Sequence, residues 1–303
     1  MRDYTRLRSD LIGDRTRHAQ RVEKLLEDAL IKLSSVATSI MGVSGRAMLH
    51  AMIDGERDPH VLAELAKGRM RTKRAALVDA LSGRFDEHHA ELADMLLSQI
   101  DSFTAQIEQL DTRIEQLLAD IPAAQAARGV DTGDGGPTPQ YLSAVDRLDE
   151  ITGVGRHAAE VIIAEVGLSM TVFPTCGHLV SWAKLAPRTI QSGATTRTGR
   201  TGKGNHYLKA VLGEAAAVAA RGNTFLGARY RRLAKRVGKL RALVAVSRSI
   251  LVIVWHLLAD PTSRYRDLGP DFFDTRLRPE RRKNNHIRQL EALGYKVTLE
   301  PAA

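Results

Sequence analysis

Residues 96–121 read LLSQIDSFTAQIEQLDTRIEQLLADI and carry the clearest structural period of the chain. Their apolar positions are spaced alternately by four and three residues: Leu96, Ile100, Phe103, Ile107, Leu110, Ile114, Leu117 and Ile121. This spacing is the seam of a coiled coil over about three and a half heptads. We expect its partner to be the segment 15–40 folded back or another subunit, and an ordinary buried helix is the alternative.

Helical periods continue on both sides of this seam. One apolar stripe recurs every three or four residues: Val22, Leu25, Leu26, Ala29, Leu30 and Leu33. In the second half, residues 210–220 are rich in alanine, and residues 243–258 are apolar nearly all round, which is typical of a central buried helix. Strand signals are almost absent, and 297–299 is the best short candidate. The sequence therefore predicts a mainly α-helical protein.

A stretch without helical period separates the two halves. Residues 123–140 read AAQAARGVDTGDGGPTPQ and are rich in Gly, Ala and Pro. The sequence therefore predicts a helical coiled-coil region at 1–121, a flexible linker at 122–140 and a helical domain at 141–303.

The positive charge of the chain is concentrated in one block. Lys and Arg number 44 against 35 Asp and Glu, which gives a formal net charge of +9. Residues 166–259 carry 15 basic side chains and a single acidic one, so this block alone has a net charge of +14. Because like charges repel, the block favours an anionic partner, and nucleic acid is the commonest large one. The alternative interpretation is a solvated basic surface.

The composition also excludes several classes of protein. The single cysteine, Cys176, excludes a disulfide framework and a thiolate zinc site, and it suits a reducing cytoplasm. The chain opens on a charged helical pattern instead of a secretory signal, and its longest apolar run, 250–259, is about half a membrane span. The His88-His89 pair lacks further ligands at metal spacing, so a solvated pair is expected there and no metal site is predicted.

Residues 148–155 read LDEITGVG and precede the apolar positions of a second helix. A Gly-Val-Gly turn between two short helices is a helix-hairpin-helix-like pattern. Glycine lets the backbone approach a phosphate closely, and the start of a helix presents its amides to that phosphate. We therefore interpret Gly153 and Gly155 as sequence-independent phosphate contacts, with an ordinary turn as the alternative.

Residues 187–205 read PRTIQSGATTRTGRTGKGN, with four glycines, four basic residues and no acidic one. A basic, glycine-rich backbone is suited to wrapping phosphates. Ser192 is a candidate nucleophile on a phosphodiester, although by residue type alone it is more often merely polar. The remaining candidate nucleic-acid contacts in this segment are Arg188, Gly193, Arg197, Arg200, Lys203 and Asn205.

In their order, these motifs resemble the C-terminal domain of insertion-sequence transposases of the IS110 family, with IS116 and IS902. The resemblance covers essentially 1–303. The residues that carry it are the LDEITGVG turn, Phe173-Pro174, 182–187, Ser192-Gly193, Arg197 and Arg200, Lys203-Gly204-Asn205, Tyr207-Leu208 and the tail segments 265–269 and 290–294.

The resemblance implies DNA transposition by a serine nucleophile, which maps onto Ser192 and forms a covalent link to a DNA phosphate. It also implies oligomers, here a homo-oligomer through the coiled coil, and a structured bridge RNA as a partner. The family binds Mg²⁺ through four acidic residues of an RNase H-like domain. No Asp or Glu of this chain matches that tetrad, so we expect an N-terminally truncated, non-autonomous member that holds no metal itself.

We expect a cytoplasmic, prokaryotic protein that lies on the nucleoid when bound to DNA and has no membrane partner. Two other classes remain open from the residues. A non-catalytic nucleic-acid-binding or regulatory remnant would bind with steep salt dependence and leave strands intact. A coiled-coil interaction protein explains 96–121 but not the +14 block.

Overall fold

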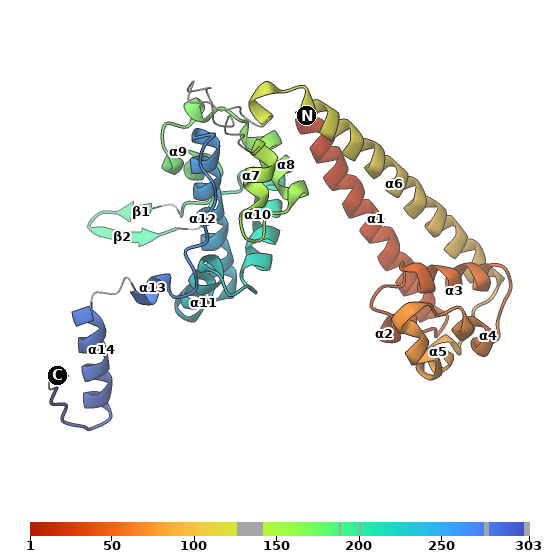
Figure 1. Ribbon diagram of the computed structural model, residues 1–303. Coiled ribbons are helices and arrows are strands. Elements are labelled where there is room, and N and C mark those ends of the chain that lie inside the picture. Colours follow the sequence, from red (N-terminus) through yellow and green to blue (C-terminus); the bar gives the residue numbers. More distant parts are fainter. Residues whose placement is uncertain (126–141, 188, 200, 276–278, 300–303) are drawn as a thin grey trace, which may run out of the picture. The chain divides into compact units, whose positions relative to one another are not determined.

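The computed structural model describes residues 1–125, 142–187, 189–199, 201–275 and 279–299 (Figure 1). The fold is mainly helical, as predicted, with one small two-stranded sheet. Apart from Arg2, the chain divides into two compact units between Leu117 and Leu118. Most of the predicted linker at 122–140 lies outside the described residues.

The first unit is built on two long antiparallel helices, α1 (Arg2–Asp28) and α6 (Glu87–Ala119), which lie side by side (Figure 1). Arg8 donates to Asp111 at 2.6 Å, and the rings of His18 and Phe103 meet edge to face at 5.1 Å. Residue numbers therefore rise along α1 as those of their contacts on α6 fall, as in an antiparallel pair. The seam predicted on α6 is therefore covered by a helix of the same chain.

The α1 side of this pairing is partly polar. Its inward positions are also spaced by three and four residues: Thr5, Arg8, Ile12, Arg15, Ala19, Val22 and Leu26. Thr5 and Arg8 are only 0 % and 2 % exposed. Because these polar residues interrupt the apolar period, the sequence pattern revealed the seam clearly on α6 alone.

Short helices cap one end of this pair (Figure 1). They are α2 (Leu33–Val36), α3 (Val43–Ile53), α4 (Pro59–Glu64), the 3-10 turn η1 (Gly68–Lys73) and α5 (Arg74–Leu81). Their apolar faces share one core with the adjoining ends of α1 and α6, including Leu26, Leu33, Met48, Leu49, Leu62, Leu77 and Leu97. This core fixes the end of the helical pair at which α6 begins.

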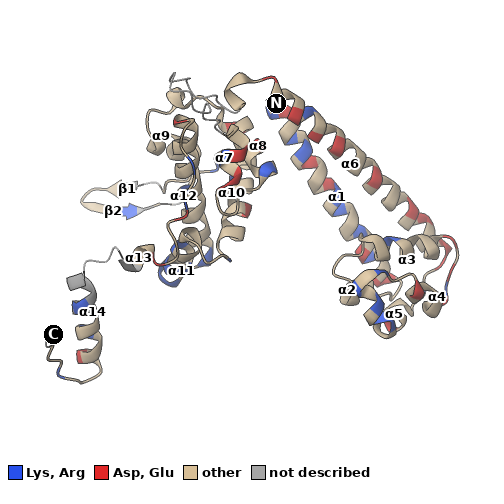
Figure 2. Ribbon diagram, in the orientation of Figure 1, with Lys and Arg blue, Asp and Glu red and all other residues tan. Residues whose placement is uncertain are grey.

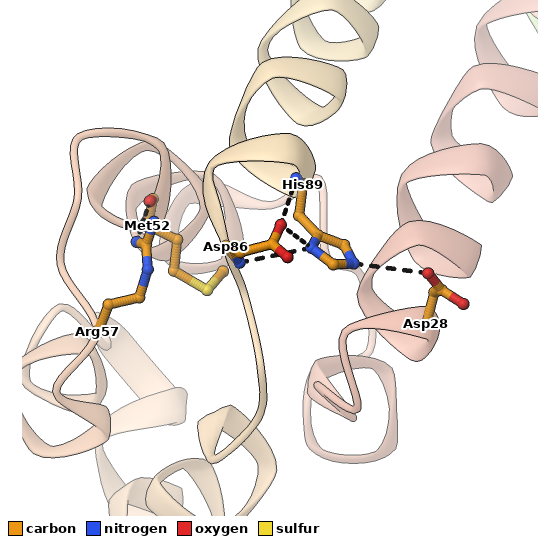
Figure 3. Close-up of polar contacts among 5 residues, drawn as sticks. All are labelled: Asp28, Met52, Arg57, Asp86 and His89. Carbon is orange, nitrogen blue, oxygen red and sulfur yellow. Dashed lines mark hydrogen bonds and ion pairs between the residues drawn. The ribbon is translucent and has the colours of Figure 1, made fainter.

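A buried histidine ties this end together (Figure 3). His89, at the start of α6, is 8 % exposed. Its Nδ1 lies 2.5 Å from the Asp86 carboxylate, and its Nε2 lies 3.6 Å from that of Asp28 at the end of α1. Nearby, Arg57 donates to the Met52 carbonyl. The expectation of a solvated His88-His89 pair is therefore wrong for His89, because tertiary packing covers it.

The second unit is arranged around α12 (Lys239–Ala259), which packs against α7 (Ala144–Asp149), α9 (Cys176–Trp182), α10 (His206–Ala219) and α11 (Phe225–Val237). Its remaining elements are the 3-10 turns η2 (Pro122–Ala124) and η3 (Met170–Val172), α8 (Arg156–Val166), β1 (Thr189–Ser192), β2 (Thr195–Thr198), α13 (Phe272–Thr275) and α14 (Pro279–Ala292).

By length and composition α12 is apolar enough to cross a membrane. Here it is the core helix, with Val246, Ile250, Leu251 and Val254 fully buried. Ser247 donates to a carbonyl of α10 at 3.0 Å. The predicted central helix is thus confirmed.

The strand prediction was wrong. Residues 297–299 form no strand, whereas 189–198 fold into an antiparallel hairpin. Its two-residue turn, Gly193-Ala194, has φ +58° at Gly193, where a type II′ hairpin turn requires glycine. The flanking threonines and Ile190 are β-branched, which favours strands. The glycines of the segment masked this short β pattern in the sequence.

Candidate functional site

The Gly-Val-Gly turn joins α7 to α8, and its two glycines lie in different surroundings. Gly153 has φ +89°, and a Cβ there would lie 2.3 Å from the Ala215 carbonyl of α10. Its side chain is therefore excluded by helix packing. Gly155 is the N-cap of α8 with φ −96°, is exposed and has no atom within 4 Å of an added Cβ. Of the two predicted phosphate contacts, Gly155 alone faces open space.

A strap that the sequence analysis missed holds this turn in place. Arg264 Nε donates to both carboxylate oxygens of Glu150, at 2.8 and 3.0 Å. The hydrogen bonds from Arg264 lower the pKa of Glu150. Asp267 then accepts from the first backbone amide of α11, that of Phe225, at 3.2 Å. Residues 264–267, which include the start of the tail segment that resembles the transposase family, thus connect the end of α7 to the start of α11. Local spacing in the sequence could not reveal this connection.

Arg147 is a second residue that sequence reasoning missed. It is 4 % exposed and donates to the carbonyls of Leu257 and Asp260 at the end of α12. Burial lowers the pKa of its guanidinium. Its place between the apolar positions Val145 and Leu148 was the one available sequence signal for burial.

Ser192 closes β1 at the tip of the hairpin and is exposed. In the register of the hairpin, Ser192 faces Thr195, and Ile190 faces Arg197. Side chains alternate between the two faces of a strand, so Ser192 and Arg197 share one face of the ribbon as diagonal neighbours. The structure therefore brings the predicted nucleophile and one predicted phosphate clamp together.

The return of the hairpin is anchored to the helices. A Cβ on Gly204 would lie 2.6 Å from the Ala183 carbonyl after α9, so this glycine serves close packing. Lys209 Nζ donates to the Gly202 carbonyl at 2.8 Å. Asn205 caps α10 by accepting from the Leu208 amide at 3.0 Å, and its Nδ2 donates to the buried Glu165 at 2.6 Å. Asn205 thus acts inside the fold, and a phosphate contact would compete with these bonds.

The remaining predicted contacts divide between two places. Lys203 is exposed at the base of the hairpin, whereas Arg188 and Arg200 lie outside the described residues. Gly155 and the Asn205–Glu165 contact lie at opposite ends of α8, about 15 Å apart at the helical rise of 1.5 Å per residue. The helix-hairpin-helix turn and the base of the hairpin are thus two separate parts of the second unit, at the two ends of α8.

Residues 145–231 match the sequence model of the Transposase IS116/IS110/IS902 family. This segment is a domain of that family of transposases. The match begins in α7 and ends in α11, so the transposase domain includes both the Gly-Val-Gly turn and the serine hairpin. A transposase domain of this family implies DNA transposition and DNA binding. No curated protein sequence matches the chain.

The described part of the transposase domain and of the rest of the chain contains no group of three or more His, Cys, Asp or Glu side chains placed to hold a metal ion. The described side chains therefore do not fit the four-acid Mg²⁺ site that the family resemblance implies. The buried acids of the domain, Glu160 and Glu165, are engaged with Arg156 and Asn205.

Proposed function

We propose that this chain acts in DNA transposition through Ser192, whose hydroxyl attacks a DNA phosphodiester. The observation that carries the proposal is the pairing of exposed Ser192 with Arg197 on one face of a hairpin inside a transposase domain. A hairpin tip can reach a phosphate in DNA, because it presents its hydroxyl without surrounding protein. Arg197 on the same face is suited to stabilise the charge that develops on the phosphoryl oxygens.

The reaction is a transesterification. A bond forms between Ser192 Oγ and phosphorus, and one phosphorus–oxygen bond to a deoxyribose breaks. The serine proton passes to a base or to solvent, and the departing deoxyribose oxygen takes up a proton. The number of phosphoester bonds is unchanged, so strands can be rejoined by the reverse attack. The covalent serine–phosphate link is the signature of this mechanism.

Other groups bind DNA in this proposal. Lys203 and, outside the described residues, Arg188 and Arg200 contact phosphates near the hairpin. The start of α8 at Gly155 offers backbone amides to a more distant phosphate. We assign Gly153 and Asn205 positioning roles instead, because the first packs on α10 and the second caps it.

Mg²⁺ and bridge RNA are further parts of the proposal, drawn from the family resemblance. The described residues offer no group of side chains placed to hold the metal ion. The structured RNA would serve as a guide that base-pairs with DNA. Gel-shift binding of a structured RNA, compared with an unstructured RNA of equal length, tests this partner.

We also propose a homo-oligomer, formed over the outer face of the α1–α6 pair. α1 buries the Ile100, Ile107 and Ile114 side of the predicted seam, but Leu96 stays half-buried beside a groove that Leu92 and Met95 also line. Met95 is 63 % exposed. Sedimentation of a Met95→Lys variant should shift toward the monomer, and an unchanged profile would refute this interface.

The covalent intermediate tests the catalytic proposal. The full chain is incubated with nicked duplex substrates, with and without Mg²⁺, and protein–DNA adducts are resolved under denaturing conditions. We expect an adduct that disappears in Ser192→Ala. Thr195→Ala is the matched control, because Thr195 faces Ser192 on the same side of the hairpin and also carries a hydroxyl.

An adduct that persists in Ser192→Ala refutes the nucleophile. If the wild type binds DNA in a salt-dependent manner but forms no adduct under any condition, the alternative function stands: a non-catalytic nucleic-acid-binding protein. Ser192 is exposed, and its hydroxyl makes no hydrogen bond among the described residues. This lack of an activating partner favours the alternative.

A further inference from the structure

A second cationic site lies outside the serine hairpin, on α11 and α12. From Phe225 to Arg248 the chain has eight basic residues and no acidic one: Arg229, Arg231, Arg232, Lys235, Arg236, Lys239, Arg241 and Arg248. Figure 2 shows the basic colour gathered on α11. A helix this basic with no acidic residue has no counter-charge of its own.

The two helices bring arginines that are distant in sequence near one another. A single residue, Gly238 at φ +86°, connects α11 to α12, and the two helices pack against each other. Arg229 lies nine residues before Gly238, and Arg248 lies ten residues after it. The contact between the two helices brings Arg248 close enough for its charge to act on Arg229.

Arg229 is the half-buried centre of this group. Its Nε is buried and has no hydrogen-bond partner among the described residues. Burial is the main cause that lowers the pKa of Arg229, and the charges of Arg232 and Arg248 lower it further. In the part of the chain that the structure describes, no carboxylate forms an ion pair with any of these three arginines.

Arg232 is held in place by aromatic rings. Its guanidinium carbon lies 4.1 Å from the centroid of the Phe273 ring of α13. Phe273 stacks in turn on Phe225 at the start of α11, with centroids 5.1 Å apart. An aromatic face attracts a guanidinium without neutralising it, so Arg232 keeps its positive charge for an anion. The rings are half-buried against one another, so they fix an arginine instead of offering a platform for bases.

We propose that Arg229, Arg232 and Arg248 form a phosphate-binding site for the backbone of duplex DNA, in addition to the serine hairpin. Three converging guanidinium groups without counter-ions repel one another, and a phosphate relieves this repulsion while accepting their hydrogen bonds. Phe225 and Phe273, the rings described beside these arginines, are half-buried, which favours backbone contact over base stacking. The choice of DNA as the polyanion rests on the proposed function.

The test measures binding of the full chain to a duplex of random sequence over a range of salt concentrations. Arg229→Gln and Arg248→Gln should each weaken binding about tenfold at low salt and reduce the slope of log affinity against log salt by about one. Lys235→Gln is the matched control. It removes one exposed charge from the same helix, but Lys235 is not among the groups that shift Arg229.

Stability without DNA distinguishes a binding role from a structural one. Because Arg229→Gln relieves repulsion, the variant should unfold at the same or a higher temperature than the wild type. Weaker binding together with unchanged or higher stability supports the site. A binding loss no greater than that of Lys235→Gln, or a loss that only follows unfolding, overturns it. A loss confined to RNA, with duplex DNA binding intact, also overturns it.

The outcome is separable from that for Ser192. If wild-type DNA binding and the Ser192 adduct are intact while the arginine variants behave as the control does, this site fails and the proposed function stands. If the wild type does not bind DNA, both fail.

Discussion

Asn205 donates from its side-chain amide to the buried carboxylate of Glu165 at 2.6 Å, while its oxygen accepts from the amide of Leu208. One side chain thus starts α10 and joins it to α8, at the point where the serine hairpin returns to the helices. A residue that sequence reasoning placed on DNA is therefore a structural connection beneath the hairpin.

Replacing Asn205 should destabilise the second unit. Asn205→Ala removes a helix cap and a hydrogen bond to a buried carboxylate, together about 2–4 kcal/mol of unfolding free energy. Asn205→Asp keeps the cap oxygen but sets a second carboxylate against Glu165, so its loss should shrink when the pH is lowered. Urea denaturation measures both, with His206→Ala as the exposed control. Equal stability of Asn205→Ala and His206→Ala would contradict this role.

The two glycines of the Gly-Val-Gly turn should respond oppositely to alanine. Gly153→Ala forces a side chain against the Ala215 carbonyl at positive φ, and it should cost at least about 2 kcal/mol. Gly155→Ala should change stability by less than about 0.5 kcal/mol, because the site is open and φ is negative. Thermal unfolding of both variants checks the stabilities.

DNA affinity then tests the phosphate contact at Gly155. Since Gly155→Ala leaves the fold intact, any loss of affinity reports on the approach of the DNA backbone to the start of α8. Affinity equal to that of the wild type would remove Gly155 from the interface without touching the packing role of Gly153.

The Arg8–Asp111 ion pair should matter more when one partner is removed than when both are replaced. Asp111→Ala leaves a cation that is 2 % exposed with a partner lost, and it should cost about 1–3 kcal/mol. The double variant Arg8→Met, Asp111→Ala should recover most of that loss, since position 8 lies on the apolar seam. Urea denaturation of the single and double variants measures this. If the double variant recovers no stability, the contribution of Arg8 to the free energy of unfolding comes from contacts other than Asp111.

Acid should weaken both units through carboxylates whose pKa is lowered on folding. Hydrogen bonds from Ser263 and Thr262 lower the pKa of Asp260 to about 2, Arg264 lowers the pKa of Glu150, and His89 lowers that of Asp86. Each group stabilises the fold above its unfolded pKa of about 4, and this stability is lost as the pH falls through the lower folded value.

Unfolding midpoints between pH 5 and pH 2 measure this dependence. Asp260→Asn should flatten the pH dependence of the second unit in this range, while Asp79→Asn, on α5 of the first unit, should leave it unchanged. A pH profile of Asp260→Asn that matches the wild type would remove Asp260 from the acid response.

The amino-acid sequence by itself determined the mainly helical class, the seam on α6, the central helix α12 and the transposase motifs. These features follow from the local periodicity of apolar residues and from short sequence motifs, both of which depend only on residues close together in the chain. It did not determine the partner of the seam, because the α1 side carries Thr5 and Arg8 at inward positions, and Arg8 is bound there by Asp111, more than a hundred residues away.

Tertiary structure alone decided what each motif residue does. Gly153 was predicted to contact phosphate, but it is glycine because the Ala215 carbonyl of α10 lies within 3 Å of where a Cβ would be, and the Ala183 carbonyl restricts Gly204 in the same way. Ser192 and Arg197 came onto one face through a hairpin register that the glycine-rich string concealed. Close packing and strand pairing join residues far apart in the chain, so only the folded chain distinguishes a residue that holds the site from one that faces DNA.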